Sequence, residues 1–364
     1  MKINKKYAWL ALAAVILTSC ENESISFPDF EYQTVYFANP YPVRTLELGE
    51  DLFVDTSLDN EHKVEIKATI GGVYANKKNV LIDFVVDESL CDNLYFEGTD
   101  TRVLPLPASY YKLASNVLTI KSGNPMGGVV VEFTDAFFQD PKSLSRNYVI
   151  PLVMTNVLGA DSILRGEAVV DSPDRCNSSN WSIAPRDYVL YAMKYVNPWH
   201  GNYLRRGVDS YTKDGVAGTN VRHQEYVERD PVIKLSTTSY SGVELPVVYT
   251  NKGGINLPVT TIVNFDGDNC TISPKATSIQ VNSEVRVYNI TASGSGKFVK
   301  RGEKNSIGGK DRDAIYLDYE VAFDVETRPA GGAAVYETQR YSTKDTLVVR
   351  DRAVAPEYFA VERK

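Results

Sequence analysis

The sequence contains few of the residues that build metal sites. Histidine occurs three times and cysteine four times in 364 residues. His62, His200 and His223 fall at no metal-ligand spacing, and no HExxH motif occurs. The acidic turn at Asp266 lacks the distal glutamate of an EF-hand-like calcium loop. We therefore predict no bound metal ion and no cofactor.

Cysteine is also too sparse for a disulfide framework. After Cys20 only Cys91, Cys176 and Cys270 remain, an odd number with no CxxC spacing. Free thiols packed in the interior are the favoured interpretation. A single disulfide among the three is the alternative.

Motifs of the common hydrolases and nucleotide-binding enzymes are missing as well. The sequence has no GxSxG elbow and no glycine-rich phosphate loop followed by a helix. Cys176 with His200 or His223 is a weak candidate for a nucleophile and base, because small thiols in β proteins usually serve packing. A carboxylate pair for glycoside hydrolysis would leave no distinctive pattern among 46 acidic residues. We predict that the protein is not an enzyme, with a glycoside hydrolase as the alternative.

An excess of basic residues is absent, which excludes a general attraction for nucleic acid. Without residues 1–19 the chain carries 36 basic and 46 acidic residues, so its net charge is negative. Residues 20–184 hold 12 basic and 24 acidic residues, whereas residues 185–364 hold 24 and 22. This change in balance indicates two domains with different surfaces.

The clearest long apolar run lies at the N-terminus. Lysines at the start are followed by Ala8–Leu17 and by the tetrad LTSC, which ends at Cys20. The run is too short to span a bilayer and has the layout of a secretory signal. With the tetrad it resembles a bacterial lipoprotein signal. This resemblance implies that residues 1–19 are removed and that a lipidated Cys20 anchors the chain to a membrane.

A short polar segment follows the expected anchor. Residues 20–30 are mostly polar or acidic, and we interpret them as a tether. Glu21 and Glu23 resemble the surface-export signals of lipoproteins in gut-type Gram-negative bacteria. We therefore expect an outer-membrane location that faces the cell exterior, with the periplasmic face as the alternative.

Residues 31–172 have the pattern of an antiparallel β-sandwich. Apolar and polar residues alternate over Lys63–Ile70, as in a strand with one wet face. About seven short strands without long helices between them predict an Ig-like sandwich. The other clear strand signals, each bounded by turn-forming residues, are Val80–Val86, Val129–Phe133, Tyr148–Met154 and Gly166–Val170.

The second half of the chain predicts a different β architecture. Residues 173–184 form a linker in which serine and asparagine cluster with Pro173 and Asp174. Longer strands follow, and Ile315–Glu326 alternates over twelve residues. Asp266 and Gly267 suit a tight hairpin. We predict a lipocalin-like, up-and-down antiparallel barrel of about eight strands over residues 185–364. Its other expected strands are Tyr188–Val196, His200–Arg206, Arg222–Glu228, Val232–Thr237, Val259–Phe265, Val285–Ala292, Val335–Tyr341 and Thr346–Arg350.

Both halves resemble known domains. LPLPASYYKL, VLTIKSG, GGVVVEFTDAFF and NYVIPLVMT follow one another between residues 104 and 155. This order resembles the N-terminal Ig-like domain of unknown function on surface lipoproteins of glycan-utilisation systems, of the starch-utilisation type. The same domain precedes some endo-β-N-acetylglucosaminidase modules, whose DxxDxDxE string is missing here. YVLYAMKYVNPWHGNYLRRGVD, from residue 188, looks like the start of its β-rich companion domain. The resemblance implies an oligosaccharide ligand and a TonB-dependent import complex as partners.

Tyrosine content adds support for a binding protein. The chain has 23 tyrosines and 13 phenylalanines, and amphipathic aromatic rings suit the apolar faces of sugars. Tyrosine also suits half-buried strands, so no single tyrosine identifies a site. Several lie in segments that we expect to be loops, namely Tyr41, Tyr74, Tyr211, Tyr240 and Tyr249.

The stretch NPWHGNYLRRGVD, Asn197–Asp209, concentrates aromatic and basic residues. As a strand it places Trp199 and Arg205 on one face and Arg206 on the other. Arg205 over the Trp199 ring would plug one barrel end through a cation–π contact. For Trp199 we favour this closure over direct glycan contact. The candidate glycan-binding residues are Trp199, Tyr203, Arg205, Arg206 and Tyr211.

These observations lead to one expectation for function. We expect a non-catalytic, cell-surface lipoprotein that binds an oligosaccharide and passes it to an import system. The alternatives are a glycoside hydrolase and a structural or adhesive surface protein that binds other proteins.

Overall fold

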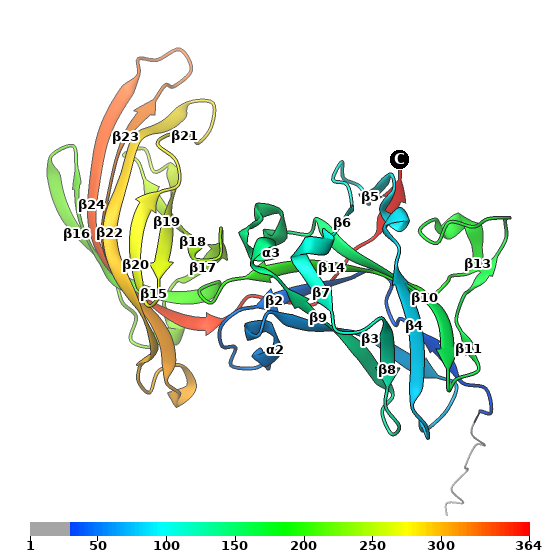
Figure 1. The fold of residues 1–364 in the computed structure, drawn as a ribbon. Helices are drawn as coiled ribbons and strands as arrows, with labels where there is room; N and C mark the ends of the chain where they lie inside the picture. The colour runs from blue at the N-terminus through cyan, green and yellow to red at the C-terminus, as the bar shows by residue number, and fades with distance from the viewer. Residues whose placement is uncertain (1–29) are drawn as a thin grey trace, which may run out of the picture.

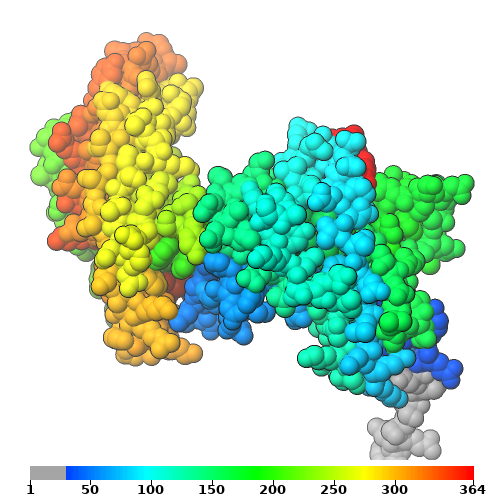
Figure 2. Space-filling model, viewed as in Figure 1, coloured from blue at the N-terminus to red at the C-terminus, as the bar shows by residue number. Residues whose placement is uncertain are grey.

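The computed structural model describes residues 30–364 and consists almost entirely of β-strands arranged in two domains (Figure 1). The predicted all-β fold is therefore confirmed. Residues 1–19, Cys20 and nearly all of the expected tether lie outside the described residues. Within residues 30–364 no helix is long and apolar enough to cross a membrane. The space-filling view shows two bodies that meet over a narrow region (Figure 2).

The N-terminal domain is a twelve-stranded sheet that folds over on itself into a sandwich. In hydrogen-bonded order its main strands are β11 (Ser162–Ile163), β1 (Thr34–Tyr36), β3 (Lys63–Gly71), β9 (Met126–Phe133), β8 (Val117–Ile120), β4 (Val80–Val86), β10 (Tyr148–Leu158), β14 (Tyr188–Val196), β2 (Pro42–Glu47) and β25 (Glu357–Tyr358). Two further strands, β6 (Leu104–Pro105) and β7 (Tyr111–Leu113), pair with β10 and β9. Because β14 runs parallel to β2 and β1 parallel to β11, the sheet is mixed rather than wholly antiparallel as predicted.

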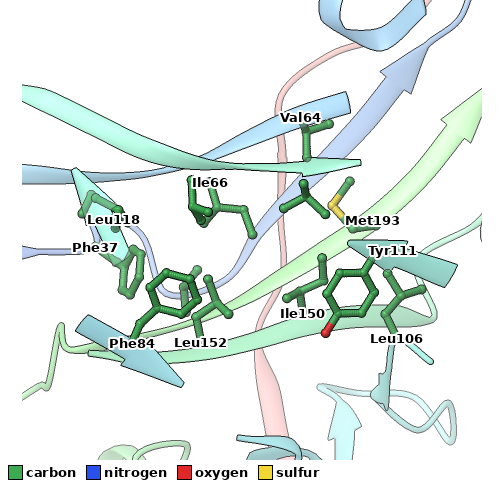
Figure 3. Close-up of a cluster of buried hydrophobic side chains, with 14 of the residues drawn as sticks. Phe37, Val64, Ile66, Phe84, Leu106, Tyr111, Leu118, Ile150, Leu152 and Met193 are labelled. Atoms are coloured by element: carbon green, nitrogen blue, oxygen red, sulfur yellow. The ribbon is translucent and has the colours of Figure 1, made fainter. Parts of the chain in front are cut away.

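The core of this domain lies between the two layers of the folded sheet. Val64 and Ile66 of β3 point towards Ile150 and Leu152 of β10, and Phe84 of β4 lies beside them (Figure 3). The four aliphatic side chains are fully buried or nearly so. Each buried side chain of this kind stabilises the fold by roughly 1.5–3 kcal/mol.

Smaller elements complete the domain. The predicted strand Gly166–Val170 is reduced to β12 (Glu167–Ala168), which forms a separate ribbon with β13 (Trp181–Ile183) within the expected linker. A second ribbon joins β5 (Leu94–Phe96) to β26 (Val361–Arg363). Within residues 30–364 the α-helices are α2 (Ser57–Asn60) and α3 (Asp135–Gln139), and 3-10 turns of this domain span Glu88–Cys91, Ala108–Tyr110, Pro141–Leu144 and Ser178–Asn180. Two further 3-10 turns, Val227–Arg229 and Ile307–Gly309, lie between strands of the second domain.

Two segments predicted for the second domain belong to the first. β14, Tyr188–Val196, pairs with β10 and β2 instead of opening the barrel. Both of its faces are buried, as in a central strand covered on two sides. The C-terminal strands β25 and β26 also return to the N-terminal domain. The prediction that residues 185–364 form one barrel domain is wrong for these two segments.

The barrel predicted for the second half is present. Eight antiparallel strands follow one another, and pairing of the first with the last closes the sheet. Most side chains at odd-numbered positions point inward and form the second core. The eight strands are β15 (Gly201–Lys213), β17 (Val232–Thr237), β18 (Gly242–Thr250), β19 (Asn256–Asp266), β20 (Asn269–Pro274), β22 (Val285–Glu303), β23 (Arg312–Thr327) and β24 (Val335–Asp351), with β16 (Val216–Arg222) and β21 (Ile279–Gln280) added at β15 and β22.

Candidate functional site

The barrel wall is interrupted where β15 changes its partner. Residues Gly201–Leu204 of β15 pair with β17, whereas Gly207–Lys213 pair with β16. β18 pairs with β17 only at Val243–Glu244. Among the described strands no pairing joins β16 to β18. The wall is therefore open between β16 and the part of β18 that lies far from the N-terminal domain, and we call this opening the seam.

Two local features keep the seam open. Pro246 of β18 has no N–H group to offer to a neighbouring strand, as is typical of strand edges. Residues 223–231 make an excursion between β16 and β17 that prevents one continuous strand. Asp230 fixes this excursion, because it accepts hydrogen bonds from Arg206 Nε at 2.6 Å and from the Gln224 amide at 2.9 Å.

A pocket of about 340 Å³ opens at the seam. We call it the seam pocket. Two of the five candidate residues from the sequence, Arg205 and Tyr211, contribute to it. Its lining consists of Arg205, Asp209, Tyr211, Lys213, Thr219, Asn220, Arg222, Val247, Val248, Tyr249, Thr250 and Tyr341.

Asp345 holds the floor of the seam pocket together. It accepts hydrogen bonds from Arg205 Nε at 2.9 Å, from Arg222 Nη2 at 2.6 Å and from the Tyr319 hydroxyl at 3.0 Å. Its side chain is completely buried. Charge-assisted bonds to two arginines satisfy a carboxylate that would otherwise be costly to bury.

A second carboxylate, Asp209, extends this network towards the opening. Arg222 donates to it as well as to Asp345. Asp209 also accepts a hydrogen bond from Thr343 Oγ1 at 2.9 Å and a second one from Asn220 Nδ2 at 3.3 Å. Two arginines and two aspartates therefore alternate from the floor to the mouth, and their charges balance.

Aromatic rings form the end of the pocket that lies away from the N-terminal domain. Tyr341 lies between Tyr249 and Tyr211, with ring centroids 4.3 and 5.9 Å away. Burial raises the pKa of Tyr249 and Tyr341 well above its usual range, so both hydroxyls stay protonated. Lys213 Nζ lies 5.4 Å from the Tyr211 ring centroid and donates to the Thr250 carbonyl at 3.1 Å.

This arrangement suits recognition of a polyhydroxylated ligand. Planar tyrosine faces offer contact with C–H surfaces, and carboxylate, amide and guanidinium groups exchange hydrogen bonds with hydroxyls. Asp209 and Asp345 both accept hydrogen bonds from arginine side chains. Within residues 30–364 no cluster of three or more metal-ligating side chains occurs, and Cys91, Cys176 and Cys270 are buried free thiols.

Trp199 and Tyr203 serve the barrel core. The Trp199 ring stacks on Phe265 with centroids 3.9 Å apart and planes 5° apart. Arg205 points to Asp345, so the predicted cation–π contact with Trp199 is wrong. Tyr203 is 1% exposed and donates its hydroxyl to the Trp199 carbonyl at 2.9 Å. Neither residue lines the seam pocket.

The remaining candidates divide between the two faces of β15. Arg206 lies on the opposite face from Arg205 and pairs with Asp230. Tyr211 is half-buried and lines the pocket. Tyr211 and Tyr249 lie in strands β15 and β18 and not in loops as expected.

Sequence reasoning missed several residues of the pocket. A signal was present in β24, where polar residues occupy inward positions that a simple barrel would fill with apolar side chains. The missed residues that build the floor and walls are Asp209, Asn220, Arg222, Tyr319, Tyr341, Thr343 and Asp345.

Comparison with known proteins gives two family matches. Residues 198–353 match a model described as "Domain of unknown function (DUF5627)". Residues 30–161 match a model described as "-like, N-terminal domain". A search of curated proteins found no match.

Solved structures from Bacteroides ovatus resemble the chain to different degrees. A multidomain protein including DUF1735 is 12% identical over 89% of this chain and 97% of that chain, with a TM-score of 0.38. A provisionally described carbohydrate-binding protein from strain ATCC 8483 is 14% identical over 66% of each chain, with a TM-score of 0.26. These two likenesses are too weak to support an inference. A third structure, of unknown function, is 50% identical over 92% of this chain and 100% of that chain, with a TM-score of 0.79. Residues 198–353 match the DUF5627 model, and the chain belongs to the same family as this Bacteroides ovatus protein of unknown function.

Proposed function

We propose that the protein binds an oligosaccharide in the seam pocket and does not cleave it. The observation that carries this proposal is the combination of tyrosine rings with Asp209, Asn220 and Arg222 around one opening. A site that binds a sugar places an aromatic ring next to several hydrogen-bond donors and acceptors.

The charge arrangement favours binding over hydrolysis. A glycoside hydrolase needs one carboxylic acid that gives up a proton and a second carboxylate across the scissile bond. In the seam pocket Asp209 and Asp345 are both engaged by Arg222. Hydrolysis at another place on the chain is the alternative that the experiment below addresses.

We further propose that a lipidated Cys20 holds the protein on the outer face of the outer membrane. The tetrad LTSC and the acidic residues after it support this location. A protein so placed would capture a glycan and pass it to a TonB-dependent import complex. Replacement of Cys20 by alanine should release the protein from the membrane fraction, and continued membrane association would contradict the anchor.

A glycan array followed by titration calorimetry tests the proposed ligand class. Tyr211→Ala should weaken binding of any array hit at least tenfold, because it removes the half-buried ring of the pocket. Tyr336→Ala is the matched control, since Tyr336 lies on β24, is 59% exposed and does not line the pocket. New reducing ends after long incubation would instead indicate a hydrolase. Binding to proteins and to no glycan would indicate an adhesive subunit.

A further inference from the structure

The back of the seam pocket is a continuous sheet. β24 pairs with β15 over Asn202–Lys213 and with β23 over Ala314–Thr327. No gap in this pairing lies behind Tyr341 or Asp345. A ligand that enters through the seam therefore has no exit through the opposite wall.

The floor is also closed. Arg205 and Tyr319 bond to Asp345 there, and these side chains are nearly or completely buried. Beyond them, towards the N-terminal domain, the interior is filled by Tyr203 and Leu347, which are 1% and 0% exposed. A chain cannot continue down the barrel axis past this packed layer.

Hydrogen bonds and ion pairs limit the seam at its two ends. At the end far from the N-terminal domain, Lys213 Nζ and Gln339 Nε2 each donate to the Thr250 carbonyl at 3.1 Å, and Lys252 pairs with Asp214. At the other end the ion pair of Arg206 with Asp230 anchors the excursion between β16 and β17. The mouth is thus framed on four sides by β16, β18 and these two sets of contacts.

From this enclosure we infer that the seam pocket receives the end of a glycan chain, or a single terminal branch, and not an internal stretch of a polymer. The inference rests on the proposed function. A volume of about 340 Å³ lies at the lower end of the roughly 300–1,000 Å³ that small-molecule sites span. A polymer running through would need a second opening, and the described walls offer none at the back or the floor.

A chain-length series tests this inference. Malto-, xylo- and manno-oligosaccharides of one to seven units, with amylose, xylan and mannan as polymers, are titrated into the protein. For a series that binds, the dissociation constant per chain end should level off after two or three units. Polymer binding per gram should fall as chain length rises, because only ends are bound.

The outcomes separate the inference from the proposed function. Affinity that keeps rising to seven units, or polymer binding per gram that is independent of length, overturns end recognition and leaves glycan binding intact. Absence of binding to all three series and to the glycan array overturns both.

A blocking variant locates the binding event at the seam. Val248 lines the mouth and is 60% exposed, so Val248→Trp should obstruct entry without disturbing the core. Val232→Trp is the control, since Val232 on β17 is 50% exposed and does not line the pocket. We expect at least a tenfold loss of affinity for the first variant and less than a twofold change for the second. Equal affinities in the two variants would overturn the assignment of the site to the seam pocket.

Discussion

The rings of Trp199 and Phe265 lie parallel, 3.9 Å apart, at the end of the barrel next to the N-terminal domain. Trp199 precedes the first barrel strand and Phe265 lies near the end of β19, so the contact joins segments that are distant in sequence. Stacked rings contribute roughly 0.5–1.5 kcal/mol beyond the surface they bury. The tryptophan therefore packs against the core at this end of the barrel.

Trp199→Ala should lower the free energy of unfolding by about 3 kcal/mol, at the lower end of the range for large aromatic residues because the ring is only partly buried. Urea denaturation followed by circular dichroism measures this loss. Trp199→Phe is the control and should cost less than half as much, because a ring remains and the indole Nε1 has no hydrogen-bond partner in the described residues. Equal midpoints for the wild type and the alanine variant would contradict a closing role.

Asp345→Asn should destabilise the barrel by about 3–5 kcal/mol, because it leaves the buried guanidinium groups of Arg205 and Arg222 without their shared carboxylate. Thermal or urea unfolding checks the loss. Asp318→Asn on the neighbouring strand is the control, since that carboxylate is 62% exposed and pairs with exposed Lys344. A similar small effect for both variants would show that the network does not support the fold.

His200 predicts a dependence of stability on pH. Burial, with Lys234, Arg352 and Lys194 nearby, lowers its pKa from 6.5 to about 4, and Nδ1 accepts a hydrogen bond from the Thr237 amide. Between these values the unfolded chain binds the proton more readily than the folded chain. The stability that neutral His200 provides is therefore complete above pH 6.5 and declines as the pH falls towards 4.

The His200 effect amounts to about 3 kcal/mol over this range. Other groups also titrate there, so the difference between wild type and a variant is the useful quantity. His200→Asn keeps an acceptor near Nδ1 but does not titrate, and its stability relative to the wild type should rise as the pH falls from 7 to 4.5. A difference that stays constant across pH would refute the assignment. Urea unfolding at pH 7, 5.5 and 4.5 provides the data.

Asn220→Ala tests the rim of the seam pocket. Asn220 is exposed and donates to Asp209, so its loss should change stability by less than about 0.5 kcal/mol. If the pocket binds glycan, affinity should fall about tenfold, which corresponds to about 1.4 kcal/mol. Calorimetry with the best array ligand measures this change. Asn156→Ala in the N-terminal domain is the control and should leave affinity unchanged.

The fold could be predicted largely because many strands have one face exposed to solvent, so that polar and apolar residues alternate along them. The alternation of Ile315–Glu326 lies within β23, and the Asp266–Gly267 turn joins β19 to β20 as expected. β18 was missed because Pro246 interrupts its pattern, although an edge position tolerates proline. β14 was assigned to the wrong domain because periodicity shows that a strand exists and does not show which sheet it joins.

The site was harder to predict because the polar residues that point into the barrel have the sequence pattern of a turn. Val335–Tyr341 and Thr346–Arg350 were predicted as two strands separated by the polar residues 342–345. They form one strand, β24, in which Thr343 and Asp345 point inward to Asp209 and Arg205. The residues that satisfy them come from β15 and β16 through strand register, which no local pattern specifies.

Arg352 links the two domains through backbone carbonyl groups. Its guanidinium donates to Leu48 O at 3.0 Å and Glu50 O at 3.0 Å in the N-terminal domain. It also donates to Asn197 O and His200 O, both at 2.8 Å, in the segment that leads into the barrel. Arg352 is 5% exposed, so water cannot easily replace these bonds.

Arg352→Met should therefore uncouple the domains. Four carbonyls lose the Arg352 donor, and its bonds to Leu48 O and Asn197 O are buried. A buried group left unsatisfied costs roughly 1–3 kcal/mol before relaxation. We expect differential scanning calorimetry of the variant to resolve two unfolding transitions, one for each domain, that overlap more in the wild type. The first transition of the variant should lie at a clearly lower temperature than unfolding of the wild type. Arg350→Met is the control, because Arg350 is 53% exposed and its nearest carboxylate, on Asp351, is 3.7 Å away. If Arg352→Met unfolds like the control, the contact does not hold the domains together, and their relative position depends on the strand connections alone.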